Sequence, residues 1–386
     1  MKVCMILLDS FKYDNRTYKE CIVLGKNGYE VVVLGIKDSD TPESEEFELF
    51  KVRRIKVNSR YLGKNKVTLL IKIMEYFLKS CLQSIRERAN FYHCHNAESL
   101  LIGYIASRIN RSKLIYDSRE LFLDKYGYKF IPKFFKYIFY LYERFFIGRV
   151  DAVIDVNENR ANVLISRYKI SKPIVISNFP FYDRYINTNK IRRVLGLNNL
   201  QKIVLYSGAI REDRGIKVLI ESAKLINNDT VIVFMGDGEV EKFMKLIIEL
   251  NLENKVFFIP PVTPGEIYEY IVSADIGVCL IENVSLNNYL GTPSKLFDYL
   301  ICGVPVIAGG FLGAKEWVEK NEVGKVVDPN NPIEIANAIN EILNNPSMIN
   351  KFKENALFLA KNKYNWDIES CKLLSLYKRL ENEKYK

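Results

Sequence analysis

The sequence is poor in the residues that metal and disulfide chemistry require. It contains only two histidines in 386 residues, His93 and His95, which argues against a histidine-rich metal site. No two of its seven cysteines form a CxxC pair, so neither a zinc ribbon nor a disulfide framework is predicted. The scattered cysteines are Cys4, Cys21, Cys81, Cys94, Cys279, Cys302 and Cys371. We expect reduced thiols in a cytosolic protein.

Long apolar runs and targeting signals are also missing. No uninterrupted apolar run reaches the length of a membrane-spanning helix. The opening MKVCMILLDS has the pattern of a first strand and is too short for a signal peptide. No GxGxxG follows that strand, which disfavours a dinucleotide oxidoreductase.

The charge balance favours anionic partners. The chain has 56 basic and 46 acidic residues, a net charge of +10. Such a balance suits nucleotides, phospholipid headgroups or nucleic acid, although a lysine-rich surface would also produce it. Because no recognised nucleic-acid motif is present, we expect no nucleic-acid partner and keep DNA binding only as an alternative from another class.

Strand-like and helix-like patterns alternate through two stretches of the chain. The first runs from residues 3–8 to 174–176 and the second from 203–207 to 332–343, with an aperiodic linker at 177–191. This pattern predicts an α/β protein with two Rossmann-like, doubly wound domains that face a central cleft. We assign residues 1–180 to the first domain, 181–364 to the second, and 365–386 to a closing amphipathic helix.

The segment TPSKLFDYLICGVPVIA, residues 292–308, predicts a phosphate site. It joins a turn to a helix beginning near Ser294, and then to a buried strand. A helix N-terminus offers free N–H groups to an anion, here near Lys295 and Leu296. Asp298 lies one turn inside the helix, where its carboxylate can accept hydrogen bonds from a ribose. The segment therefore predicts a nucleoside diphosphate site.

Three other features of the second half point to the same ligand. In SGAIREDRG, a strand leads into Gly208, and Arg211 and Arg214 can donate to phosphate oxygens. In FMGDGE, the glycines mark either a close approach to a ligand or a tight turn. In PPVTPGE, a proline-stiffened loop can flank a flat base. The residues concerned in the last two features are Gly236, Gly238, Pro261 and Val262.

The first half offers two candidates for the cleft. HCH closes a strand, so one histidine can face the core while His95 faces the cleft. Glu120 follows the strand at 113–116 and lies on the cleft side if the sheet runs as predicted. A core position for His95 stays open.

Residues 125–149 predict a helix at a membrane surface. Aromatic and basic residues alternate there, with Glu143 as the one acidic residue. Aromatic rings favour the headgroup boundary, and cations favour anionic lipid. An ordinary core helix with a solvated lysine face is the alternative. The residues we assign to lipid are Lys133, Phe134, Phe135, Lys136, Phe139 and Arg144.

Taken together, SGAIREDRGI, VIVFMGDGE, SADIGVCL, PSKLFDYLICGVPVIA and GKVVDPNNP resemble the family 4 retaining glycosyltransferases of GT-B fold. YHCHNAESL, LIYDSRELF and VISNFP in the first half, and NWDIESCKLLSLYKRL at the end, extend the resemblance to nearly the whole chain. It implies that the first domain binds the acceptor, the second binds a nucleotide-sugar, and the closing helix returns to the first domain.

The resemblance also implies roles for single residues. Arg214 takes the position of a phosphate-binding lysine, and Ser294 and Lys295 supply backbone N–H groups to the diphosphate. Asp298 stands where relatives have the ribose-binding glutamate. The chain departs from the family at Ala209 and Leu290, where relatives have arginine and glutamate, and at Arg119, where many have histidine.

The function implied is retaining, metal-independent transfer of a sugar from a UDP- or GDP-linked donor to a glycan or lipid-linked acceptor in surface polysaccharide or glycolipid synthesis. No cofactor is expected. Arg211, Arg214, His95, Arg119 and Glu120 form the predicted catalytic set, and the protein is expected on the inner face of the cell membrane. A nucleotide-sugar epimerase of the same architecture is the alternative; the sugar, acceptor and oligomeric state stay open.

Overall fold

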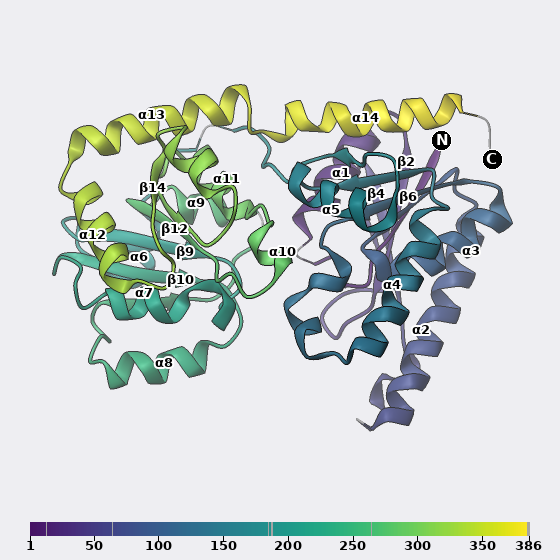
Figure 1. Cartoon of the computed structure of the whole chain (residues 1–386), viewed down its shortest axis with the longest axis horizontal. Coiled ribbons are helices and arrows are strands. Elements are labelled where there is room, and N and C mark those ends of the chain that lie inside the picture. Colours follow the sequence, from purple (N-terminus) through teal and green to yellow (C-terminus); the bar gives the residue numbers. More distant parts are fainter. Residues whose placement is uncertain (13, 64, 184, 187, 264, 384–386) are drawn as a thin grey trace. The chain divides into compact units, whose positions relative to one another are not determined.

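The chain, seen here in a computed structural model, divides into two compact units (Figure 1). The structure describes residues 1–383 except 13, 64, 184, 187 and 264. The first unit comprises Met1–Ser177 and Glu369–Lys386, and the second comprises Asn178–Ile368.

The first unit is built on an eight-stranded sheet in the order β3-β4-β2-β1-β5-β6-β7-β8. All neighbouring strands are parallel except β3 and β4, which pair antiparallel. Every residue of β5 and β6 is buried, as expected where helices cover both faces of a parallel sheet. The strands are β1 (Lys2–Ile6), β2 (Glu30–Ile36), β3 (Ser44–Glu46), β4 (Phe50–Ile55), β5 (Phe91–His95), β6 (Lys113–Ser118), β7 (Ala152–Asp155) and β8 (Ile174–Val175).

The helices of this unit begin at residues that cap them. Asp14 accepts the N–H of Thr17 at the start of α1, and Asn65 does the same for Thr68 in a capping box at the start of α2. The helices are α1 (Asn15–Lys26), α2 (Lys66–Glu87), α3 (Leu100–Asn110), α4 (Lys133–Ile147), α5 (Glu158–Tyr168) and the part of α14 (Trp366–Asn382) that follows Ile368.

The last helix, α14, closes the first unit through buried aromatic side chains. The Tyr377 ring lies 5.0 Å from that of Phe91 and 5.4 Å from that of Tyr29, and the Tyr377 hydroxyl lies 2.9 Å from Nδ1 of His93. The Tyr29 hydroxyl donates to Glu381 across 2.7 Å. The C-terminal segment is therefore part of the core of the N-terminal unit.

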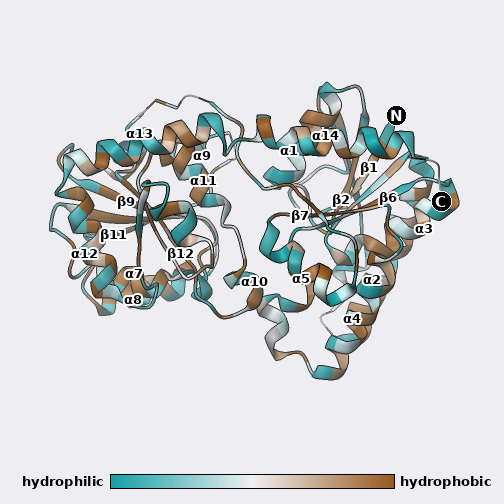
Figure 2. Cartoon of the chain, turned by 45° about the horizontal axis from the view of Figure 1, so that its top comes forward, coloured by the Kyte–Doolittle hydropathy of each residue, from teal (hydrophilic) through white to brown (hydrophobic). Residues whose placement is uncertain are grey.

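The second unit has a six-stranded parallel sheet in the order β11-β10-β9-β12-β13-β14. Strands β9 and β12 of this sheet are brown in Figure 2, because they consist mostly of apolar residues. The strands are β9 (Lys202–Ser207), β10 (Thr230–Met235), β11 (Val256–Ile259), β12 (Ile276–Leu280), β13 (Val306–Gly309) and β14 (Gly324–Val326).

Helices cover both faces of this second sheet and bury two apolar clusters. One cluster contains Leu296, Phe297 and Leu300 of α11, and the other contains Ile335 and Ile339 of α12. The helices are α6 (Lys190–Leu195), α7 (Ile216–Ser222), α8 (Val240–Glu249), α9 (Ile267–Ile271), α10 (Leu286–Tyr289), α11 (Ser294–Ile301), α12 (Pro332–Leu343) and α13 (Pro346–Asn362).

Two sequence-based expectations need correction. Residues 125–149 do not form one helix: α4 begins at Lys133 after Pro132, and Tyr126–Phe130 form a short 3-10 helix, because the residue before a proline is driven out of the helical conformation. Part of the expected linker at 177–191 is packed, since Phe179 is 6% exposed and its ring lies 4.5 Å from that of Phe297. Residues 184 and 187 of that segment lie outside the described residues.

Among the helices that the structure describes, none is both long enough and apolar enough to cross a membrane.

Candidate functional site

The second unit has a topological switch point between β9 and β12. From β9 the chain continues to β10 and β11 on one side, whereas β12 leads to β13 and β14 on the other. Loops that leave such neighbouring strands diverge, and ligands of open α/β sheets bind where they do. The loop at 208–215 follows β9, and α11 follows the loop that leaves β12.

The glycines at this edge let backbone segments lie against one another. Gly208, Gly236 and Gly238 all have positive φ angles, of 130°, 155° and 140°. A Cβ on Gly236 would lie 2.0 Å from the Gly208 carbonyl oxygen, and one on Gly238 would lie 2.2 Å from that of Ile210. The N–H of Ile210 donates to the carbonyl of Asp237 across 2.8 Å. The lack of a side chain at Gly236 and Gly238 therefore lets the second loop lie against the first, and their predicted contact with the donor stays a prediction.

Arg211 and Arg214 share one carboxylate. Arg211 donates twice to Asp213, across 3.1 and 3.0 Å, and Nε of Arg214 lies 3.5 Å from the same carboxylate. Asn288 of α10 adds a third donor across 3.1 Å. Burial raises the pKa of Asp213, but Arg214, Asn288 and Arg211 together hold it below its ordinary value. Asp213 thus fixes both arginines beside the Gly208 loop, with 46% of the Arg211 side chain exposed.

Helix α11 presents its first turn at the same edge. Pro293 is the N-cap residue, and its side chain accepts no hydrogen bond. No N-cap side chain therefore competes with a ligand for the first N–H groups of the helix. Ser294 is exposed, whereas Leu296 is fully buried in the core and its N–H already donates to the Pro293 carbonyl across 3.1 Å, so Leu296 offers a ligand neither its side chain nor a free N–H. The Lys295 ammonium lies 3.4 Å from the centroid of the Tyr206 ring.

Asp298 is held by an aromatic pair. The Tyr268 hydroxyl lies 3.3 Å from Oδ1 of Asp298, and the Tyr268 ring stacks on Tyr185 with centroids 4.6 Å apart. Burial, and next the Asp298 carboxylate, raises the pKa of Tyr268, so its hydroxyl stays a donor. Sequence reasoning missed Tyr268, because its position in α9 carries no motif.

The proline-rich loop after β11 is open. Pro261 is exposed, and Val262 is half-buried against the core of the unit. Pro264 of the same loop lies outside the described residues.

In the first unit, the strand ends meet a buried charge network. Arg16 of α1 donates to both oxygens of Asp117, across 2.9 and 3.1 Å, and lies 3.1 Å from Glu20. Nδ1 of His95 lies 3.3 Å from Asp117, and the His95 ring stacks on His93 at 4.5 Å. His95 is 1% exposed, so it has the core position that the sequence left open as the alternative. Burial, and next the charge of Arg119, lowers the pKa of His95 to about 4, so the ring is neutral at pH 7.

Arg119 belongs to this network, whereas Glu120 does not. Arg119 donates to Asp14 across 2.5 Å, to Thr17 across 2.5 Å and to Asp117 across 3.2 Å. The Glu120 side chain is 49% exposed and lies 3.4 Å from the Lys125 ammonium. The catalytic roles of His95, Arg119 and Glu120 stay predictions.

Four residues of the network could in principle approach one cation. Ligand atoms of Glu20, His93, His95 and Asp117 lie within 4.8 Å of one another, and all four residues are buried. The Arg16 guanidinium, however, already bonds both oxygens of Asp117 and contacts Glu20. These carboxylates are neutralised by arginine, so the residues present fit a salt-bridge network better than a metal site.

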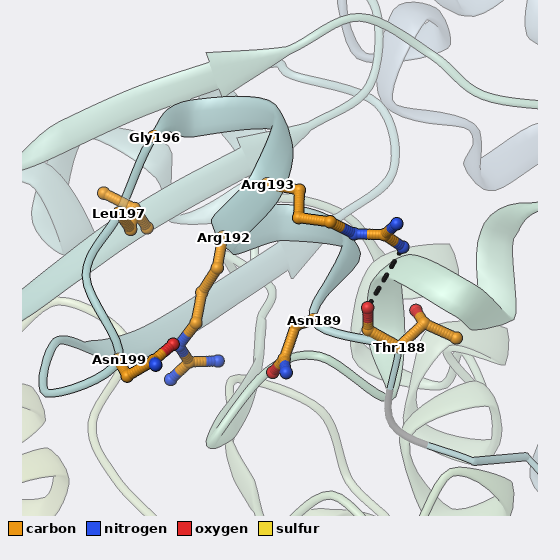
Figure 3. A pocket seen from close by; sticks show the side chains of 7 residues that line it. All are labelled: Thr188, Asn189, Arg192, Arg193, Gly196, Leu197 and Asn199. Carbon is orange, nitrogen blue, oxygen red and sulfur yellow. Dashed lines mark hydrogen bonds between the residues drawn. The ribbon is translucent and has the colours of Figure 1, made fainter.

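The second unit also has a cavity of about 770 Å³ around α6 (Figure 3). Arg193 donates to the Thr188 carbonyl at its mouth, and Arg192 bonds the carbonyls of Ser273 and Gln201 and the carboxylate of Asp275. The residues that line the cavity precede β9 in the chain, and none of them is a predicted donor-binding residue. Three donors of Arg192 are thus already used by acceptors of the unit itself.

Helix α4 is apolar on its outer side as well as its inner side. Phe139 packs inward, 5.6 Å from the Phe122 ring, whereas Phe134 and Phe135 are 69% and 50% exposed. Lys133 and Arg144 are exposed and Lys136 is half-buried.

Helix α2, which the sequence did not single out, also exposes a set of large apolar residues. It contacts α3, as α4 does. The exposed residues on α2 are Val67, Leu69, Leu70, Ile71, Ile73, Met74, Leu78 and Leu82.

Comparison with known proteins gives the two units consistent relatives. The family described as Glycosyl transferases group 1 matches residues 187–357, and that described as Glycosyltransferase Family 4 matches residues 16–179. The D-inositol 3-phosphate glycosyltransferase of Corynebacterium efficiens is 26% identical over 200 residues, 49% of this chain and 46% of that protein. The chain thus spans about half the length of the first curated relatives it matches.

Solved structures share the architecture over the whole chain. Sucrose-phosphate synthase from Thermosynechococcus elongatus aligns with a TM-score of 0.81 at 18% identity, covering 99% of each chain. The Anabaena protein HepE in complex with UDP and glucose aligns with a TM-score of 0.76 at 16% identity, covering 98% of this chain and all of that one. At such identities the likeness establishes the GT-B fold.

Proposed function

The chain belongs to the family 4, group 1 glycosyltransferases, and on that premise we propose that it transfers a sugar from a nucleoside-diphosphate sugar to a glycan or lipid-linked acceptor. The donor is UDP- or GDP-linked, and HepE, a structural neighbour, was solved with UDP-glucose. The acceptor belongs to surface polysaccharide or glycolipid synthesis.

One observation carries the proposal. At the switch point of the second unit, two arginines held by Asp213 and the uncapped first turn of α11 lie at the ends of neighbouring strands. N–H groups at a helix start and guanidinium groups are the donors that bind phosphate oxygens. To Asp298, one turn further along α11, we assign the role of accepting hydrogen bonds from the ribose hydroxyls.

We propose retention of configuration without a metal. In such a reaction the diphosphate leaves with its oxygens stabilised by fixed donors, and one of them accepts the proton of the acceptor hydroxyl on the same face. The carbon–oxygen bond to the diphosphate breaks as the bond to the acceptor oxygen forms. Arg211, Arg214 and the α11 N–H groups supply the charge stabilisation in this scheme.

The test is a thermal-shift panel of UDP, GDP, ADP and their sugars, each with and without EDTA. A ligand at 100 times its Kd should stabilise the protein by about 2.7 kcal/mol. We expect one nucleotide family to stabilise the chain with EDTA present, and Arg214→Ala and Asp298→Ala to abolish most of the shift. Lys217→Ala, on the solvent side of α7, is the matched control and should respond like the wild type. No shift with any nucleotide would refute the proposal.

Product analysis separates transfer from epimerisation. With donor and acceptor present, NMR should show the anomeric configuration of the donor kept in the product. A nucleotide-sugar isomer formed without acceptor would show the epimerase instead.

The acceptor is proposed to be lipid-linked because the first unit has an apolar and basic surface, which we call the α2–α4 surface. It consists of the exposed apolar residues on α2 together with Lys133, Phe134, Phe135 and Arg144 on α4. Aromatic rings bury at the headgroup boundary, and each lysine or arginine near anionic lipid contributes about 1 kcal/mol. We propose that this surface rests on the cytoplasmic face of the membrane.

Flotation with liposomes tests the surface. The full chain should float with vesicles containing phosphatidylglycerol and not with phosphatidylcholine alone. Replacing Phe134 and Phe135 with serine, or Leu69 and Leu70 with serine, should each reduce binding. Phe358→Ser on α13 is the control, since Phe358 is 67% exposed in the other unit. Equal flotation of all variants would contradict the assignment.

A further inference from the structure

Lys295 differs from the other cations at the donor edge of the second unit. Arg211 and Arg214 are both paired with Asp213. Among the residues that the structure describes, no carboxylate pairs with Lys295, and its printed contact is the face of Tyr206. A lysine in the first turn of a helix is also opposite to what the helix dipole favours, because the N-terminus already carries partial positive charge. The position of Lys295 is therefore poor for stability and suited to an anion.

The Lys295 ammonium lies directly against the first donor loop. A Cβ on Gly208 would come within 3.1 Å of Nζ, so the absence of a side chain at Gly208 leaves room for it. The Tyr206 ring beneath it is buried and fixed, because its hydroxyl donates to the Ala209 carbonyl across 2.8 Å. Nζ thus lies between the Gly208 loop and the first turn of α11, the two segments that we assign to the diphosphate.

The charge of Lys295 is marginal without a ligand. Burial, with a further contribution from Arg214 of the Gly208 loop, lowers its pKa to about 7. The charges that oppose this fall are those of Asp298 on α11 and Asp213 beside the arginines, and the Cys279 thiol on β12 would add to them only as a thiolate. The Cys279 thiol is itself neutral at pH 7, because burial raises its pKa to about 11.

We propose that the Lys295 side chain is a ligand of the donor diphosphate and takes up a proton from solvent as the donor binds. The neutral amine gains one proton, and the resulting ammonium pairs with a phosphate oxygen. This inference rests on the proposed function and extends it, since the sequence predicted only backbone N–H groups from this residue.

Proton uptake fixes the direction of the pH dependence. Binding an anion raises the pKa of Lys295 above its free value, so donor affinity is full below that value and falls as the pH rises above it. With a free pKa of about 7, uptake per bound donor should be about 0.1 proton at pH 6 and about 0.9 at pH 8. The affinity should fall about 25-fold between pH 6.5 and 8.5.

Isothermal titration calorimetry measures this directly. The full chain is titrated with UDP-glucose, GDP-mannose and ADP-glucose, in pairs of buffers that differ in ionisation enthalpy. Nucleotide-sugars are chosen because neither of their phosphates titrates near neutral pH, whereas the terminal phosphate of a free nucleoside diphosphate does. Lys295→Met removes the charge, Lys295→Arg makes it permanent, and Lys217→Met on α7 is the control.

The variants give distinct outcomes. We expect Lys295→Met to bind weakly with no proton uptake, Lys295→Arg to bind without pH dependence, and Lys217→Met to match the wild type. If the wild type binds a nucleotide-sugar but Lys295→Met shows the same affinity and uptake, the role of Lys295 is refuted and the proposed function stands. If the wild type binds none of the three, the proposed function fails, and this inference with it.

Discussion

Replacing Arg119 separates a structural role from a catalytic one. The Arg119 guanidinium bonds Asp14, Thr17 and Asp117. The Arg119 side chain is 15% exposed and that of Asp14 is 10% exposed, so water can replace a lost partner of either charge only in small part. Arg119→Ala therefore leaves a desolvated carboxylate at the N-cap of α1.

The size of the effect follows from burial. Removing one partner of a buried ion pair costs about 3–5 kcal/mol, and the remaining exposure places the expected loss near the lower end. Burial alone would raise the pKa of Asp14, but the Arg119 guanidinium holds it well below its ordinary value. In the wild type the lowered Asp14 pKa contributes stability to the fold, which is present at neutral pH and is lost as the pH falls through the folded-state pKa of Asp14. In Arg119→Ala the Asp14 pKa rises, so the deficit should be largest near pH 7 and shrink towards pH 4.

The assay must report on the first unit. Both tryptophans, Trp317 and Trp366, belong to the second unit, so intrinsic fluorescence would miss the change. Amide hydrogen exchange of peptides from α1, β5 and β6 reports on the correct region. Asp14→Asn keeps the helix cap and removes the buried charge, so Asp14→Asn/Arg119→Ala should recover part of the loss. If Arg119→Ala showed unchanged amide hydrogen exchange but had lost sugar transfer, the structural account would be refuted and a direct role of Arg119 in the reaction shown.

Three further predictions follow from single contacts. Gly236→Ala should lower stability by about 1–3 kcal/mol, because its Cβ would clash with the Gly208 carbonyl, whereas Gly265→Ala meets open space and should be neutral in the same denaturant titration. Tyr268→Phe should weaken donor binding about threefold to tenfold by calorimetry with no loss of stability, because it removes the hydroxyl beside Asp298; equal affinity would contradict this positioning role. Glu143→Gln should flatten the pH dependence of the first unit's stability: burial raises the Glu143 pKa, so wild-type stability falls as the pH rises from about 4.5 through the folded-state value, and a parallel fall in the variant would show another group responsible.

Much of the fold of the second unit could be predicted from its sequence. The predicted strands 256–259 and 276–280 and helix 332–343 agree with the structure in every residue, because each is a local apolar pattern bounded by turn residues. Helix α13 and strands β3 and β4 were missed. The alternation of apolar and basic residues in strand β4, FKVRRI, breaks at the adjacent Arg53 and Arg54, so its local pattern is weak and its pairing with β2 identifies it as a strand.

The site was predictable where it depends on local segments and not where it depends on distant pairs. Gly208 and Ser294 lie on contiguous motifs that the sequence displays. Asp213 was not identified, because an acidic residue between two arginines reads as an ordinary loop charge until the fold buries it and brings Asn288, 75 positions away, to donate to it. The partners of Arg119 were missed for the same reason, since Asp14 lies 105 residues away.

The cationic side chains of the two units differ in how fully they are paired, and this difference bears on which unit is proposed to bind the donor. In the first unit, Arg16 and Arg119 are bonded to Asp117, Asp14 and Thr17 inside the fold, so a ligand anion would have to break existing bonds to gain theirs. In the second unit, the paired Arg211 is still 46% exposed, and Lys295 has no carboxylate partner among the described residues. An anion arriving at the second unit can therefore contact Lys295 without breaking an ion pair, and can reach the exposed part of the Arg211 guanidinium beside its bonds to Asp213. This asymmetry supports the proposal that the second unit binds the diphosphate, while the charge network of the first unit holds α1 and the strand ends in place.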